Sequence, residues 1–142
     1  MTTISVTGTK ELQAALEALG DDISQSVTDA VNATGLELRS DIQKRIRNGP
    51  ATGRVYRRRS VAHQASAPGE APASDTGRLR NSITFKQESP LTVTVGSQLA
   101  YARYLEFGTR HIARRPAWAP AAMQAEPKFR KRLEAAIAGA IR

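Results

Sequence analysis

The residues with side chains suited to catalysis are few and scattered along this 142-residue chain. Its two histidines, His63 and His111, lie far apart, and cysteine is absent. A metal site needs several ligands at short spacings, and a catalytic site needs a nucleophile, a base and an orienting group together. Glu70, Asp75 and Glu106 each have a local explanation, as a loop charge, a helix cap and a partner for a nearby arginine. With no glycine-rich phosphate loop either, the sequence predicts neither an enzyme nor a bound metal or cofactor.

The basic residues carry more distinctive chemistry. The formal net charge is +8, and residues 49–142 hold sixteen Lys/Arg against six Asp/Glu, whereas residues 1–48 hold five against seven. Positive charge of this density attracts phosphates or an acidic protein surface. The densest run contains Arg54, Arg57, Arg58 and Arg59. Tyr56 beside them is placed to stack on a base, but no motif for sequence-specific recognition accompanies it. The run therefore predicts a non-specific contact with DNA or an acidic partner, or else a solvated loop.

A second candidate contact surface lies between residues 101 and 118. Tyr101, Tyr104 and Phe107 recur every third residue and share one helical face, which favours core packing, with subunit contact as the alternative. Glu106 lies off that face, between Arg103 and Arg110. Trp118 stands between two prolines, and a buried Trp often dominates contact energy. The candidate subunit or neighbour contacts are Tyr101, Tyr104, Glu106, Phe107, Arg110, Arg115 and Trp118.

The hydrophobic pattern predicts a long helix ahead of these residues. A short β segment is expected at residues 2–7. Leucine, isoleucine and valine then recur every three or four residues, which predicts a helix over 10–47, about 57 Å long. Gly20-Asp21-Asp22 is the expected place for a kink, and Asn48-Gly49-Pro50 ends the helix. A helix this long in so short a chain suggests support from neighbouring subunits.

The middle of the chain predicts a loop followed by a small antiparallel sheet. Residues 49–74 have no apolar period and are expected to form an extended basic loop, disordered in the isolated protein. Asp75 or Thr76 is expected to cap a short helix. Residues 83–88 and 91–96 alternate with period two, which predicts a hairpin that packs on the long helix.

Two further helices complete an expected α+β fold. One is predicted over 98–107 and closed by Gly108, and a basic, proline-rich loop follows. The last is predicted over 120–142, with Pro120 in its first turn, Met123 and Ile141 on its apolar side and a kink or restart at Pro127.

Composition further predicts one domain over residues 1–142, with the extended basic loop at 49–74. The N-terminal sequence lacks the features of a signal peptide, and no apolar run approaches the roughly 20 residues that span a bilayer. The absence of cysteine fits a reducing cytoplasm.

Five short runs resemble a known family. They are ASAPGEAP at 65–72, DTGRLRNSI at 75–83, VGS at 95–97, YARYLEFGT at 101–109 and RP at 115–116. Their order and spacing resemble the head–tail joining proteins of long-tailed bacteriophages, the tail-completion or neck proteins typified by the lambdoid gene-product-ten minor tail component. Family members usually follow the Arg-Pro pair with Phe and an aliphatic residue. In this sequence Ala117 and Trp118 occupy those positions, so the aromatic side chain expected to anchor a contact stands one residue later.

The resemblance implies a structural virion protein that needs no cofactor and is not an enzyme. It would be a neck or tail-completion component, or a tail terminator, that joins head to tail as a ring around the DNA channel. Its partners would be copies of itself, head-closure or connector proteins, and tail-tube or tail-terminator proteins. Passing genomic DNA would make non-specific contacts, and no membrane would be involved. Such a protein assembles in the host cytoplasm and resides at the head–tail junction of the virion. The alternative is a non-sequence-specific nucleic-acid-binding accessory protein.

Overall fold

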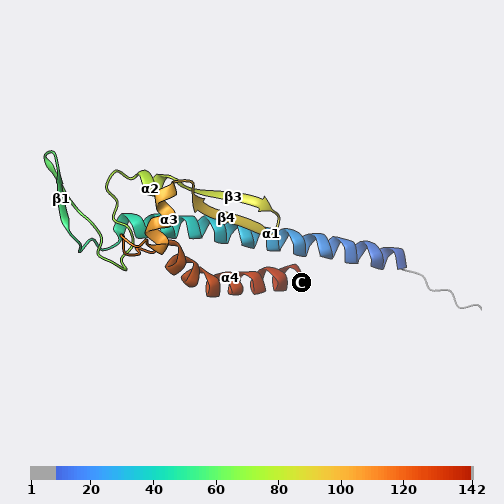
Figure 1. Cartoon of the computed structure of the whole chain (residues 1–142). Coiled ribbons are helices and arrows are strands. Elements are labelled where there is room, and N and C mark those ends of the chain that lie inside the picture. The colour runs from blue at the N-terminus through green and yellow to red at the C-terminus, as the bar shows by residue number, and fades with distance from the viewer. Residues whose placement is uncertain (1–8, 142) are drawn as a thin grey trace, which may run out of the picture.

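The molecule is organised along one helix, α1, which spans Thr9–Asn48 (Figure 1). The computed structural model describes residues 9–141, so the β segment expected at 2–7 lies outside the described residues. The 40 residues of α1 give a length of about 60 Å at 1.5 Å per residue. The helix continues through Gly20-Asp21-Asp22, where a break or kink was expected, and ends at Asn48 as predicted.

The remaining elements make the fold α+β, as the sequence predicted. In chain order they are β1 (Val55–Arg58), β2 (Val61–Gln64), α2 (Arg78–Asn81), β3 (Ile83–Ser89), β4 (Thr92–Ser97), α3 (Ala100–Phe107) and α4 (Trp118–Ala140). The strands form two separate antiparallel pairs, β1 with β2 and β3 with β4.

The β3–β4 hairpin packs on α1, and this prediction is confirmed. Phe85 pairs with Val95, and the hairpin approaches α1 so closely at Gly35 that a Cβ there would lie 2.6 Å from the Phe85 ring and 2.8 Å from Val93. Real Cβ atoms do not tolerate such distances. Gly35 therefore costs helix propensity but permits the close approach of the sheet.

The core is small and lies where the C-terminal half of α1 meets the shorter elements. Its fully buried large side chains are Ile42, Ile46 and Ile83. Leu79 of α2, Ala102 of α3 and two alanines at the start of α4 join the same cluster. Because α2, β3, β4, α3 and α4 all contribute side chains to this cluster or pack against it, the second half of α1 is the scaffold that positions them.

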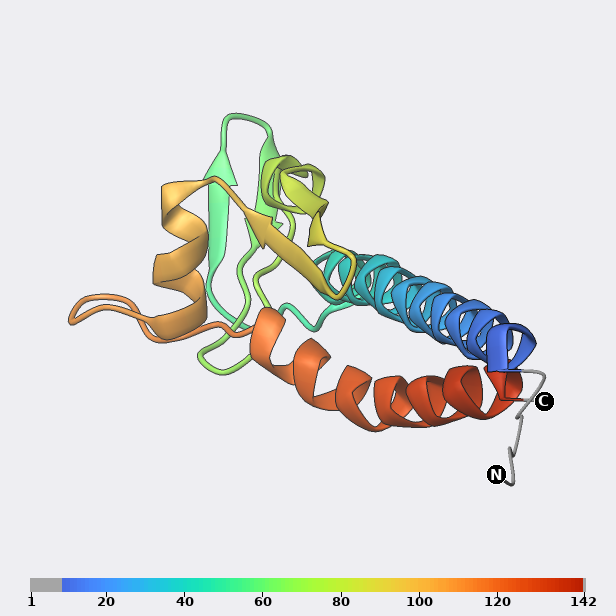
Figure 2. The same ribbon diagram turned by 90° about the vertical axis from the view of Figure 1, so that its right-hand side faces the viewer.

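Helix α4 turns back along α1 towards the N-terminal end of that helix (Figure 2). The Arg132 guanidinium joins them, since it donates to Thr34 Oγ1 at 2.9 Å and pairs with the Glu37 carboxylate. Pro127 lies inside α4 and does not end the helix. Figure 2 shows that α4 is curved. A proline inside a helix permits such bending because it removes one backbone hydrogen bond. Met123 and Ile141, expected on the apolar side, are instead 74% and 61% exposed.

Residues 49–74 are not the structureless loop that the sequence predicted. They contain the β1–β2 hairpin, with Val55 opposite Gln64 and Arg58 opposite Val61. Every residue of these strands except His63 is exposed, so no apolar alternation marks them in the sequence. Among the described helices, none combines the length and apolarity that a membrane-spanning segment requires.

Candidate interaction surfaces

A cavity of about 620 Å³ lies between the β1–β2 hairpin, the segment that leads into α2, and α3. Its walls combine arginine, tyrosine and small polar side chains and are open to solvent. The lining residues are Tyr56, Arg58, His63, Ala65, Ser66, Pro72, Ala73, Ser74, Asp75, Thr76, Gly77, Arg78, Leu79, Tyr101, Leu105 and Arg115. Four of the five runs that carry the family resemblance thus meet at one place in the fold.

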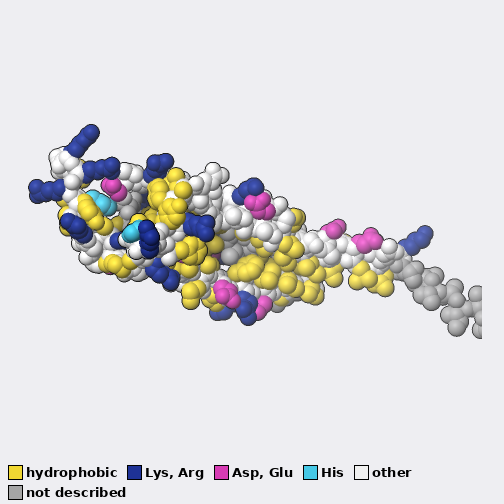
Figure 3. Space-filling model, viewed as in Figure 1, with side chains coloured by type: hydrophobic (Ala, Val, Ile, Leu, Met, Phe, Trp, Pro, Cys, Tyr) yellow, Lys and Arg dark blue, Asp and Glu magenta, His cyan; other side chains and the backbone are white. Residues whose placement is uncertain are grey.

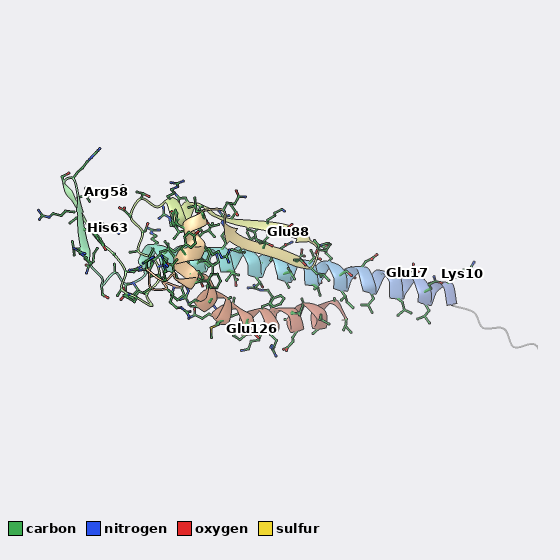
Figure 4. The ribbon with its side chains drawn as sticks, viewed as in Figure 1. Lys10, Glu17, Arg58, His63, Glu88 and Glu126 are labelled. Atoms are coloured by element: carbon green, nitrogen blue, oxygen red, sulfur yellow. The ribbon has the colours of Figure 1, made fainter. Side chains whose placement is uncertain are left out.

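Asp75 joins the hairpin to the body of the molecule across this cavity. Its carboxylate lies 3.6 Å from the Arg58 guanidinium and 3.9 Å from His63 Nδ1. Figure 4 shows Arg58 and His63 side by side on the hairpin. The expectation that Asp75 or Thr76 caps α2 is wrong for Asp75: the residue before α2 is Gly77, at a φ of 76°, and only Thr76 Oγ1 accepts a long bond from Arg78 N.

The hairpin presents arginines at one end of the molecule (Figure 3). All four candidates for DNA or acidic-partner contact, Arg54, Arg57, Arg58 and Arg59, are exposed. The Arg54 guanidinium lies 5.5 Å from the centre of the Tyr56 ring, so a cation–π contact already covers one face of that ring. Arg59, in the turn, has a φ of 57°, a conformation that disfavours side chains other than glycine.

Glu70 fastens the base of the hairpin, a role that the sequence did not indicate. Its carboxylate accepts hydrogen bonds from the Thr52 hydroxyl, from Thr52 N at 3.1 Å and from Ala67 N at 2.7 Å. These donors stabilise the charged form and hold the pKa of Glu70 below its ordinary value of 4.5, with the Thr52 hydroxyl as the largest cause. The segment before β1 and the segment after β2 are therefore joined through one carboxylate.

Glu106 is an internal helix cap, not a partner of Arg103 or Arg110. It is 8% exposed and accepts the backbone N–H groups of Ala117 at 2.7 Å, Trp118 at 3.1 Å and Ala119 at 2.8 Å. Those donors begin α4 and have no partner within that helix. The pairing inferred from its spacing is therefore wrong, and its carboxylate is occupied inside the molecule.

The aromatic residues of α3 face solvent, so the core-packing interpretation is wrong. Tyr101, Tyr104 and Phe107 are 39%, 52% and 75% exposed. Ala102 and Glu106 occupy the buried side of the helix instead. Three exposed aromatic side chains on one short helix form an apolar surface, which we call the aromatic face.

The other predicted contact residues divide between the surface and the interior. Arg110 is exposed, and its Nε lies 2.7 Å from Nε2 of His111 in the loop that Figure 2 shows projecting beyond α3. Arg115 is half-buried and donates through Nε to the Ser66 carbonyl at 3.2 Å. Trp118 packs against the core cluster. Arg115 and Trp118 therefore make internal contacts, whereas Arg110 and the aromatic face remain accessible.

A protein-family model matches most of this chain. The model described as "Bacteriophage HK97-gp10, putative tail-component" matches residues 10–108, which is more than two thirds of the chain. The chain belongs to this family. Neither a curated protein nor a solved structure gives a significant match.

The matched region of this phage tail component contains most of the candidate surface. It covers nearly all of α1, both hairpins, α2 and α3, and it ends at Gly108, where a φ of 74° terminates α3. The hairpin arginines and the aromatic face thus lie within the family region, and α4 follows it. The family is one of structural proteins, and among the described residues no group of His, Asp or Glu is placed to hold a metal ion.

Proposed function

We propose that this phage tail component acts at the neck of the virion, as a tail-completion protein that joins the head to the tail. The observation that carries the proposal is the family match together with an elongated subunit that exposes different contact surfaces along its length. A joining protein must bind unlike partners on different sides. An enzyme needs one enclosed constellation of reactive groups.

The proposed assembly is a homo-oligomeric ring around the DNA channel. A single subunit leaves much apolar area uncovered, including Leu12, Tyr104 and Phe107, at 60%, 52% and 75% exposure. Exposed apolar surface of this kind marks protein contact sites. A small core with a long projecting helix also fits a protein that completes its packing on neighbouring copies.

The β1–β2 hairpin is the proposed contact with DNA in the channel or with an acidic neighbour. It carries four exposed arginines beyond the body of the molecule. Only Arg58 is held by an acidic side chain, and that pair has side chains 81% and 49% exposed, so water screens it strongly. Such arginines contribute contacts to phosphates that do not depend on the base sequence, which suits DNA that only passes through the channel.

The proposed neighbours are a head-closure or connector protein on one side and a tail-tube or tail-terminator protein on the other. We place the protein at the head–tail junction, after assembly in the host cytoplasm. Gold-labelled antibody against the chain, viewed on intact virions by electron microscopy, tests this position. Label at the junction supports the proposal, and label confined to the distal end of the tail refutes it.

The second candidate function is a nucleic-acid-binding accessory protein without sequence preference, which the same arginines favour. This alternative predicts that the free protein binds DNA strongly and that its binding constant falls steeply with salt. It also predicts that the chain is missing from purified virions. Quantifying the chain in virions by mass spectrometry separates the two functions, since a neck protein is retained at a fixed copy number.

A further inference from the structure

The segment that leads into α2 forms one wall of the cavity of about 620 Å³, and part of its backbone is unpaired. Ala73 and Ser74 line the cavity, are half-buried and lie outside every helix and strand. Among residues 9–141, no protein group is hydrogen-bonded to the N–H or C=O of either residue. Backbone groups withdrawn from water are almost always paired. This wall therefore offers both donors and acceptors to a ligand.

The charge in the cavity is mainly positive. Three parts of the chain each contribute an arginine: Arg58 on β1, Arg78 on α2 and Arg115 ahead of α4. Among the described lining residues Asp75 alone carries a carboxylate, and its 3.6 Å separation from the Arg58 guanidinium is longer than a hydrogen bond. Arg78 has no acidic partner in the described part of the chain, and Arg115 donates to the Ser66 carbonyl. The cavity therefore favours an anionic ligand.

Only one face of the β1–β2 hairpin belongs to the cavity. Successive side chains of a strand point to opposite faces, and residues paired across two strands share a face. Tyr56 pairs with His63, and both line the cavity together with Arg58, two residues along β1. Arg57 pairs with Ala62, and neither residue lines it. Neighbouring arginines of one strand thus separate a ligand in the cavity from a ligand on the outer face.

We propose that this cavity binds an extended, acidic segment of a neighbouring virion protein. Carboxylates of the segment pair with Arg58, Arg78 and Arg115. Its backbone pairs with the free N–H and C=O groups of Ala73 and Ser74, as in the addition of a strand to an exposed edge. The proposal deepens the proposed function, on which it rests, by naming how the protein recognises one of its neighbours.

The lining favours a peptide over DNA. Phosphates would also pair with the arginines, but the DNA backbone offers acceptors only and leaves the carbonyls of Ala73 and Ser74 without a donor. A peptide backbone offers donors and acceptors in alternation. Pro72, Leu79 and Leu105 add apolar area to the cavity, which apolar side chains between the carboxylates of a peptide can cover.

The same requirement makes a different protein the occupant, not a second copy of this chain. The acidic residues of this chain lie on helices or on β3, apart from Glu70 and Asp75. The carboxylate of Glu70 is held at the hairpin base, and that of Asp75 already lies in the cavity. A second copy therefore presents no extended acidic segment among its described residues.

A synthetic peptide tests the site on the full-length protein. The probe is a fluorescein-labelled heptapeptide of alternating Glu and Ala, and binding is followed by fluorescence anisotropy at physiological ionic strength, where distant charges are screened. The matched peptide with Gln in place of Glu should bind at least about tenfold more weakly, because charged partners strengthen a hydrogen bond. Equal binding of the two peptides would overturn the proposal. Tighter binding of an oligothymidylate of the same length would also overturn it, in favour of a nucleic-acid site.

Two neighbouring arginines supply a matched pair of variants. Arg58→Gln should weaken binding of the Glu/Ala peptide about tenfold or more, and Arg78→Gln should do the same. Arg57→Gln removes the same charge from the outer face of the same strand and should change the affinity less than about twofold. Equal losses from Arg57→Gln and Arg58→Gln would show attraction to the net charge of the hairpin and would refute binding in the cavity.

Asp75→Asn gives an effect that misfolding cannot imitate. It removes the carboxylate that competes for Arg58, so the Glu/Ala peptide should bind about threefold or more tightly. Unchanged or weaker binding would count against the site.

Amide hydrogen exchange tests the backbone contact in the natural protein. Saturating Glu/Ala peptide should slow exchange at Ala73 and Ser74, and unchanged exchange at both would contradict strand-like pairing. A protein located at the head–tail junction that does not bind the peptide would refute this inference but leave the proposed function standing. Peptide binding by a chain that is missing from virions would do the reverse.

Discussion

The carboxylate of Glu106, in the last turn of α3, accepts a hydrogen bond from the backbone N–H of Trp118, the first residue of α4, at 3.1 Å. The same carboxylate also accepts from Ala117 and Ala119, so one side chain satisfies the N–H groups that begin the next helix. The negative charge of Glu106 also interacts favourably with the positive end of the helix dipole at the N-terminus of α4. Glu106 therefore sets the position of α4 relative to the aromatic face.

Replacing Glu106 with Ala should lower the free energy of unfolding by about 3 kcal/mol, because three backbone donors lose their acceptor in a buried position. Urea denaturation followed by circular dichroism measures the loss. Glu126→Ala is the control, since Glu126 is an exposed partner of Arg130 at 3.3 Å and its loss should cost under about 0.5 kcal/mol. Equal effects of the two variants would show that Glu106 does not cap α4.

Two glycines of α1 should respond to alanine in opposite directions. Gly20→Ala should stabilise the protein by up to about 1 kcal/mol, because helix propensity improves and nothing lies within 4 Å of the new methyl group. Gly35→Ala should destabilise it by about 1–3 kcal/mol, because the methyl group collides with Phe85 and Val93. Thermal unfolding of both variants measures the signs. Stabilisation by Gly35→Ala would mean that the β3–β4 hairpin does not approach α1 this closely.

Glu70 should make the hairpin base sensitive to acid. Its pKa is lowered in the folded protein, so its stabilising contribution is fully present above its ordinary pKa of 4.5 and is lost as pH falls through the lower folded value. Glu70→Gln should therefore speed amide hydrogen exchange in residues 52–67 at neutral pH. The difference between variant and natural protein should shrink as pH drops below the ordinary value. A difference that stays constant across this range would contradict a charge-dependent fastening.

Arg59 should affect ligand contact more than stability. Glycine adopts its φ of 57° without strain, so Arg59→Gly should leave stability unchanged or raise it by up to about 1 kcal/mol. If the hairpin meets DNA, the same variant should weaken binding to duplex DNA and reduce the salt slope by roughly one unit. Fluorescence anisotropy across a salt series measures both quantities, with Lys86→Gly, on β3, as the control. Identical slopes for Arg59→Gly and the natural protein would exclude the hairpin tip from the DNA contact.

Local patterns predicted the large elements well. The three-to-four spacing in the second half of α1 and the period two of β3 and β4 come from a face turned towards the core, and each was visible in the sequence. The same spacing continues through Leu12 and Leu16, which are exposed in the subunit. The β1–β2 hairpin was not, because its short strands bury no regular face, and Arg59-Ser60 lacks the Gly or Asn that usually marks a hairpin turn. A signal did exist in Val55 and Val61, β-branched residues at the two strand starts.

The candidate surface was predicted less well, because its decisive contacts are not local. The cap formed by Glu106 joins two helices across eleven residues or more, and nearby arginines at helical spacing offered a competing explanation. The aromatic residues of α3 share a face, but only the fold shows that Ala102 and Glu106 occupy the buried side. Sequence spacing therefore identified the right segment but assigned its two sides incorrectly.

Electron microscopy of particles made without this chain tests the central claim most directly. The phage is grown with a nonsense mutation in the coding sequence, with and without the natural chain supplied from a plasmid. Without the chain we expect DNA-filled heads and separate, fully formed tails, and with the chain supplied we expect joined virions. Joined, infectious virions in its absence would contradict a head–tail joining function.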